Sequence, residues 1–183
     1  MKEKRSKLGL GIALLVLGVI LLSGKFQSDS ALDQYTLASE PIEVRGFSSG
    51  QSEDLVFPNR IVIPALSIDL EVKRAKIIDG FWEVFPDTAA WGSSSGLPGE
   101  KGNQVIFAHA REGLFLPLKG VVKGMKIYVT TKDKWYSYEV KEIKEVTPDR
   151  IEVIAPTDTE TLTLYTCSGF QDSKRLIVVA KTE

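Results

Sequence analysis

From Leu55 to Glu183 the sequence is a succession of short apolar runs separated by Gly, Pro, Asn and Asp. In one run, Ile68, Leu70 and Val72 alternate with polar residues, and this period of two predicts a strand with one buried face. No run shows the longer period of an amphipathic helix. Runs of this length and spacing are typical of a β-barrel or a β-sandwich, so we expect one mainly β domain over residues 55–183.

About eight strands are expected in this domain. The segments are 60–64, 67–75, 80–85, 103–110, 125–131, 135–147, 161–167 and 175–181. The strand that starts at Trp135 changes its apolar parity at Ile143, which predicts a bulge or bend near Glu142. Short helical turns are expected at Glu112–Leu118 and Pro148–Ile154.

The N-terminus carries a separate signal. Residues 1–7 are basic, and residues 8–24 form an uncharged apolar run of about 17 residues, the short limit for a membrane-spanning helix. Because basic residues precede the run, the N-terminus is expected in the cytoplasm and the later chain outside. We therefore expect a cytoplasmic tail (1–7), a transmembrane signal anchor (8–24), a polar linker (25–54) and a domain held outside the cell membrane. A cleaved signal peptide is the alternative, and it would export the domain equally.

Composition excludes several classes of function. The 23 basic and 24 acidic residues nearly cancel, and no basic stripe is present, so nucleic acid is not an expected partner. A single Cys and a single His are too few for a structural zinc site, and one Cys cannot form an internal disulfide. Loop carboxylates could hold Ca²⁺, but no calcium-loop spacing indicates it. We therefore expect no metal and no cofactor.

The remaining chemistry is that of a nucleophilic cysteine. Cys167 ends an expected strand, and the turn signal Ser168-Gly169 follows it. If the next strand pairs with it as a hairpin, Arg175 faces Cys167 across the loop base, where its charge favours the thiolate and can stabilise an oxyanion. His109 ends another expected strand, and its imidazole could take the thiol proton. A purely structural role for His109 stays open at this point.

These residues resemble the signature of the sortase family. The stretch 163–167 reads Thr-Leu-Tyr-Thr-Cys and, with the downstream Arg175, is similar to the family's Thr-Leu-x-Thr-Cys followed by Arg. Upstream, residues 98–109 resemble the family's Pro-Gly…Gly-Asn…Ile-x-Gly-His segment, and residues 61–66 resemble its opening strand. The chain departs from the pattern at Ala108, where the family commonly has Gly, and this departure bears on substrate preference.

The resemblance implies a closed eight-stranded β-barrel and a cysteine transpeptidase activity. The substrate would be a surface protein with a C-terminal Leu-Pro-x-Thr-Gly-like sorting motif, cut between Thr and Gly through a thioester on Cys167. His109 would act as the acid and base, and Arg175 would stabilise the oxyanion. Thr166 and Ala108 would line the substrate groove. The acceptor would be an amine of a cell-wall precursor or of another surface protein.

Two other functions remain open from the sequence. A cysteine peptidase would use the same three residues and release the acyl group to water. An anchored, non-catalytic β-domain that binds a surface partner would keep Cys167 buried and inert. Residues 27–54 contain no Asp-Pro-aromatic lid motif, so the pilin-polymerising subclass with that lid is not expected.

Overall fold

The computed structural model describes residues 42–46 and 56–182, which belong to one compact unit, Ala38–Glu183. The predicted tail and signal anchor, and most of the predicted linker, lie outside the described residues. Within the described ranges, no helix has the length and apolar character that a membrane crossing requires. The predicted anchor therefore stays a prediction.

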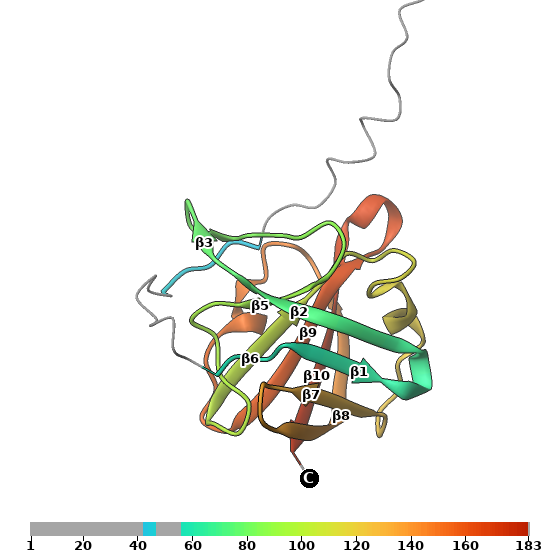
Figure 1. Ribbon diagram of the computed structural model, residues 1–183. Helices are drawn as coiled ribbons and strands as arrows, with labels where there is room; N and C mark the ends of the chain where they lie inside the picture. The colour runs from blue at the N-terminus through green and yellow to red at the C-terminus, as the bar shows by residue number, and fades with distance from the viewer. Residues whose placement is uncertain (1–41, 47–55, 183) are drawn as a thin grey trace, which may run out of the picture. The chain divides into compact units, whose positions relative to one another are not determined.

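Eight strands close into a barrel in the order β1-β2-β5-β6-β9-β10-β8-β7 (Figure 1). This confirms the mainly β fold and the closed barrel that the sequence predicted. The strands are β1 (Arg60–Ile63), β2 (Ile68–Ala75), β5 (Ala89–Gly92), β6 (Gly102–Phe107), β7 (Lys126–Thr130), β8 (Trp135–Val146), β9 (Glu160–Ser168) and β10 (Lys174–Thr182). Short 3-10 helices are η2 (Pro64–Leu66), η3 (Leu116–Gly120), η4 (Ile151–Ile154) and η5 (Phe170–Asp172). Of these, η3 and η4 overlap the two predicted helical turns.

One predicted barrel strand is wrong. Residues 80–85 do not enter the barrel, because β4 (Phe81–Trp82) pairs with β3 (Ile77–Ile78) in a separate two-stranded hairpin. The barrel takes β5 in its place, and all four residues of β5 are buried. A strand that is buried on both faces shows no period-two alternation, so the pattern did not reveal it.

The pairing of β6 with β9 brings distant parts of the sequence together. These strands run parallel, from Gly102 opposite Glu160 to Phe107 opposite Tyr165. Parallel neighbours end at the same edge, so the residues that follow β6 lie beside the end of β9. Strand β10 pairs antiparallel with β9 and with β8, and the register on β8 shifts between Val179 and Ala180. The shift leaves Lys141 as the extra residue, which confirms the bulge predicted near Glu142.

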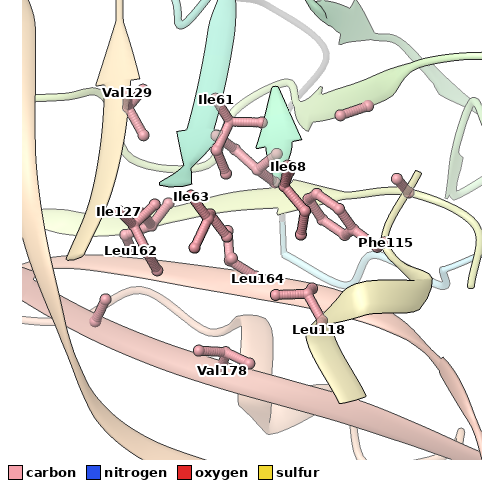
Figure 2. Packing of buried hydrophobic residues seen from close by; sticks show 14 of the residues in the cluster. Ile61, Ile63, Ile68, Phe115, Leu118, Ile127, Val129, Leu162, Leu164 and Val178 are labelled. Atoms are coloured by element: carbon pink, nitrogen blue, oxygen red, sulfur yellow. The ribbon is translucent and has the colours of Figure 1, made fainter. Parts of the chain in front are cut away.

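The barrel strands are buried on both faces near the site. Inside, aliphatic side chains from β1, β2, β7, β9 and β10 pack with two residues of the η3 segment (Figure 2). Those labelled are Ile61, Ile63, Ile68, Phe115, Leu118, Ile127, Val129, Leu162, Leu164 and Val178. A second cluster lies on the alternate side chains of β6, β9 and β10 and includes Phe107, Tyr165 and Ile177. The β3–β4 hairpin covers this second cluster, with the Trp82 ring stacked on Phe107 at 5.6 Å between centroids.

The contact between Gly92 and Trp82 gives a stability prediction. A Cβ atom on Gly92 would overlap Cε2 and Cζ2 of Trp82. The indole cannot move freely, because its N–H donates to the Ser93 carbonyl at 3.0 Å. We expect Gly92→Ala to lower the free energy of unfolding by about 1–3 kcal/mol, measured by urea denaturation. Gly120→Ala is the matched control, since its Cβ would lie 3.7 Å from Cδ2 of Leu66, an ordinary contact. Equal losses in the two variants would contradict the steric explanation.

Candidate active site

Cys167 and Arg175 are opposite each other across the β9–β10 hairpin, as the sequence predicted. The pairing continues one step further, to Ser168 and Lys174, so each strand is one residue longer at this end than the predicted 161–167 and 175–181. The connecting loop is residues 169–173. The loop starts at Gly169 with φ of 77°, and a Cβ there would lie 2.9 Å from Oγ of Ser173. The backbone conformation at this position, two residues after Cys167, therefore favours glycine.

The Arg175 side chain is almost fully buried, with 2% of its surface exposed. Its Nη1 donates to the backbone carbonyls of Asp172, at 2.7 Å, and of Lys174, at 3.0 Å. Backbone carbonyls orient the guanidinium without cancelling its charge, and a guanidinium stays charged inside proteins. The hairpin therefore holds a fixed positive charge beside the cysteine.

His109 follows the end of β6, and two contacts tie its segment to the cysteine strand. The Ala108 N–H donates to the Tyr165 carbonyl at 3.4 Å. The buried Thr166 hydroxyl donates to the Ala108 carbonyl at 2.7 Å. Each contact joins a neighbour of His109 to a residue just before Cys167. The imidazole and the thiol therefore come from segments whose relative register is fixed.

One pocket collects all the residues that the sequence singled out. It is lined by Cys167, His109, Arg175, Thr166, Ala108, Phe107, Tyr165, Val84 and Ile42. The free space among them is about 20 Å³, which is enough for about one water molecule. The structure thus brings the three predicted catalytic residues together with the two predicted groove residues. Their roles in catalysis and substrate binding stay predictions.

Sequence reasoning missed four residues of this pocket. Phe107 and Tyr165 precede His109 and Cys167 by two positions, so the strand period alone could have placed them on the same face. Val84 comes from the segment after β4, which the sequence assigned to the barrel. Ile42 comes from the predicted linker, where no pattern indicated a buried position.

The environment of His109 lowers its pKa below the ordinary imidazole value of 6.5. Burial is the main cause, because it penalises the charged form, and the positive charge of Arg111 acts in the same direction. The carboxylate of Asp172 opposes both. The neutral imidazole is therefore favoured near neutral pH, and this is the form that accepts a proton from a thiol.

No group of three or more His, Cys, Asp or Glu side chains within residues 42–46 and 56–182 is arranged to hold a metal ion. The expectation that the protein uses no metal or cofactor stays a prediction.

Comparison with known proteins identifies the relatives of this chain. The family model described as a sortase domain matches residues 61–183. A sortase A of Bacillus anthracis is 31% identical over 163 residues, which cover 85% of this chain and 70% of the relative. A sortase A of Streptococcus agalactiae serotype III (strain NEM316) is 46% identical over 71 residues, which cover 38% of this chain and only 29% of that relative's length. The solved structure of sortase A from Corynebacterium diphtheriae is similar with a TM-score of 0.62 and 26% identity, over 84% of this chain and 81% of that one.

The lowered pKa of His109 predicts a pH dependence. Because the folded-state pKa lies below 6.5, His109 contributes stability that is fully present above pH 6.5 and is lost as the pH falls through the folded-state value. The chain has one His, so an NMR titration of imidazole protons reports this residue alone. We expect Arg111→Gln to raise the pKa and Asp172→Asn to lower it. Arg150→Gln is the control, and identical titrations of Arg111→Gln and the parent would contradict the assignment.

The hydrogen bond of Thr166 predicts a stability loss in an isosteric variant. Thr166→Val keeps the shape but leaves the Ala108 carbonyl without the buried hydroxyl that it accepts from. We expect the free energy of unfolding to fall by about 1–3 kcal/mol in urea denaturation. Thr166→Ser retains the hydroxyl and should recover most of this loss. A Val variant as stable as the parent would show that the contact does not hold the two segments.

Proposed function

Because this chain belongs to the sortase family of cysteine transpeptidases, we propose that it cleaves a C-terminal sorting motif of the Leu-Pro-x-Thr-Gly kind between Thr and Gly. It then transfers the acyl group to an amine. The observation that carries the proposal is that one pocket joins the chain's only Cys, its only His and a buried Arg.

The first half-reaction forms a thioester. The sulfur of Cys167 attacks the carbonyl carbon of the substrate Thr, while the thiol proton passes to His109. The carbonyl oxygen becomes an oxyanion, which the charge of Arg175 stabilises. When the tetrahedral intermediate collapses, the C–N bond breaks and His109 returns the proton to the leaving Gly amine.

The second half-reaction transfers the acyl group. An incoming amine loses a proton to His109 and attacks the thioester carbon. The C–S bond then breaks, and the proton on His109 restores the thiol of Cys167. Both halves start from a neutral imidazole, which the lowered pKa of His109 favours. One difficult amide exchange is thereby divided into two easier steps.

The setting of the reaction is the cell surface. We propose that residues 8–24 anchor the protein in the membrane with residues 1–7 in the cytoplasm, so that the domain acts outside. Its substrates would be surface proteins that carry the sorting motif. The acceptor would be an amine of a cell-wall precursor or of another surface protein. Sortases as a family act on such proteins at membranes, and the basic and apolar order of the N-terminus agrees with this.

The test is a cleavage assay of the full-length chain with internally quenched Leu-x-x-Thr-Gly peptides, with and without a glycine-type amine. We expect cleavage at Thr-Gly and an amine-ligated product that mass spectrometry identifies. Cys167→Ala and His109→Ala should each lower the rate by at least about 10³-fold, because the two groups act as a unit. Lys181→Ala, on the exposed end of β10, is the control and should retain the rate.

Each other outcome has a defined meaning. Cleavage without ligation at high amine concentration would indicate the cysteine peptidase. Intact peptides together with an unreactive Cys167 would overturn the proposal in favour of the non-catalytic binding domain.

A further inference from the structure

An exposed pair of aromatic side chains lies on the outside of the barrel. Of the three tryptophans, Trp82 and Trp91 are buried, whereas 69% of the Trp135 surface is exposed. The ring of Tyr128, on the neighbouring strand β7, lies against the Trp135 ring with 5.5 Å between the centroids. Trp and Tyr rings on a protein surface are typical of binding sites, because they combine a large apolar face with a polar atom. Core packing does not account for this pair.

The pair belongs to the outer face of β2, β1, β7 and β8, which are neighbours in this order around the barrel (Figure 1). Every second residue of β1 and β7 is buried in the core, so the residues between them point outward. The strand register places four outward residues in one row across the strands: Glu71, Arg60, Thr130 and Trp135. The row covers three strand spacings, about 14 Å, which is roughly the length of two or three linked sugar rings.

An open hollow of about 700 Å³ lies beside the rings on this face. Thr130 joins the two features, because it lines the hollow and is directly opposite Trp135. All the residues that line the hollow are polar: Asn59, Arg60, Asp69, Glu71, Thr130 and Thr131. A flat aromatic surface therefore adjoins a hollow that offers hydroxyl, carboxylate, guanidinium and amide groups.

Hydrogen bonds orient several of these polar groups. Arg60 donates from Nε and Nη2 to the two carboxylate oxygens of Asp69, at 2.6 Å each. The Thr130 hydroxyl donates to Oδ1 of Asn59 at 2.8 Å. That bond engages the amide oxygen of Asn59 and not its NH2 group, which carries two donors. The hollow thus presents donors and acceptors in fixed positions.

Two ion pairs flank the rings. Arg60 pairs with Asp69 on the β1–β2 side, and Lys126 pairs with Glu139 on the β7–β8 side. Glu71 adds one more carboxylate to the hollow. Because the positive charges are matched, an anionic polymer meets no excess of positive charge on this face. The face therefore favours an uncharged ligand.

We propose that this face binds a neutral oligosaccharide, with one pyranose ring stacked on Trp135 and Tyr128 and the next ring held by hydrogen bonds in the hollow. The C–H groups on one face of a pyranose ring carry partial positive charge, which the negative face of an aromatic ring attracts. Sugar hydroxyls both donate and accept, so they match the mixture of carboxylate, amide and guanidinium groups. A purely apolar partner would bury the same groups without hydrogen bonds, at a cost in free energy.

This surface is separate from the catalytic pocket. Arg175 is opposite Val146 at one end of β8, and Trp135 is the first residue at the other end. The 12 residues of β8 put the two ends about 36 Å apart along the strand. The inference therefore does not need the proposed function. Where both hold, binding to a surface glycan raises the local concentration of any acceptor amine that the glycan carries.

The first test uses Trp135 as its own reporter. Acrylamide quenches the fluorescence of exposed tryptophans, and in this chain that signal comes from Trp135 because Trp82 and Trp91 are buried. The probes are cellotetraose, maltotetraose and tetra-N-acetylchitotetraose, added to the full-length chain up to about 10 mM, which detects a Kd of about 1 mM. We expect at least one of them to protect Trp135 from the quencher. Protection by none of the three would overturn the proposal.

The second test locates the bound sugar by calorimetric titration of variants. Trp135→Ala and Tyr128→Ala should each raise the Kd by at least about 5-fold, because each removes a stacking face. Glu71→Gln keeps the shape but weakens a charged acceptor, and should raise the Kd by about 3-fold. Phe170→Ala is the matched control, since the Phe170 ring is 84% exposed but lies in the β9–β10 loop. Equal Kd values for Trp135→Ala, Phe170→Ala and the parent would contradict this site.

The two proposals fail in different ways. Trp135→Ala should cleave a soluble quenched peptide at the rate of the parent, because the residue is remote from Cys167. If the oligosaccharide binds as expected while no peptide is cleaved, the sugar site stands and the proposed substrate is wrong. If peptide is cleaved and no oligosaccharide protects Trp135, the proposed function stands and the sugar site is wrong.

Discussion

The parallel pairing of β6 with β9 is the constraint on which the site depends. His109 and Cys167 are 58 positions apart, and only parallel strands would bring the two strand ends to the same edge of the barrel. Buried polar contacts fix the register at both ends of the pair. The Thr163 hydroxyl donates to Oδ1 of Asn103 at 2.6 Å, and the Thr166 hydroxyl donates to the Ala108 carbonyl. Since a slip of one residue would turn every side chain to the opposite face, these contacts also decide that the imidazole and the thiol share a pocket.

How far the sequence could predict this protein depends on whether two paired strands are close together or far apart in the chain. Cys167 and Arg175 are joined by one short hairpin, so their pairing followed from the turn signal and the two apolar runs. No spacing rule predicts that β6 lies beside β9, and the meeting of His109 with Cys167 came from the family resemblance. The N-terminal anchor and the catalytic roles remain predictions, because the first lies outside the described residues and the second requires activity data.

The error over β5 has a physical origin in the second apolar cluster. The run 80–85 has the apolar pattern of a barrel strand, and Trp82 in it is indeed fully buried. The Trp82 side chain, however, packs against the outer face of the barrel sheet, and its strand is not part of that sheet. Strand β5, in contrast, is short and buried on every side, so it lacks alternation. Where a sheet is covered on its outer face, apolar periodicity reports burial without saying which layer a residue belongs to. Ile42 and Val44 were missed for a different reason, because they are two apolar residues in a polar stretch that shows no sustained apolar period.

The apolar side chains that cover the outer face of the barrel sheet also determine the electrostatics of the pocket. Phe107, Tyr165, Val84 and Ile42 surround the polar groups with apolar surface, and burial is the largest cause of the lowered pKa of His109. A charged imidazole would lose solvation there, whereas the guanidinium of Arg175 donates hydrogen bonds to the backbone carbonyls of Asp172 and Lys174. The resting site therefore favours one fixed cation and one neutral base. In this arrangement the base is free to receive the thiol proton, and the cation is already in position when negative charge develops on the substrate, so little reorganisation is needed during the reaction.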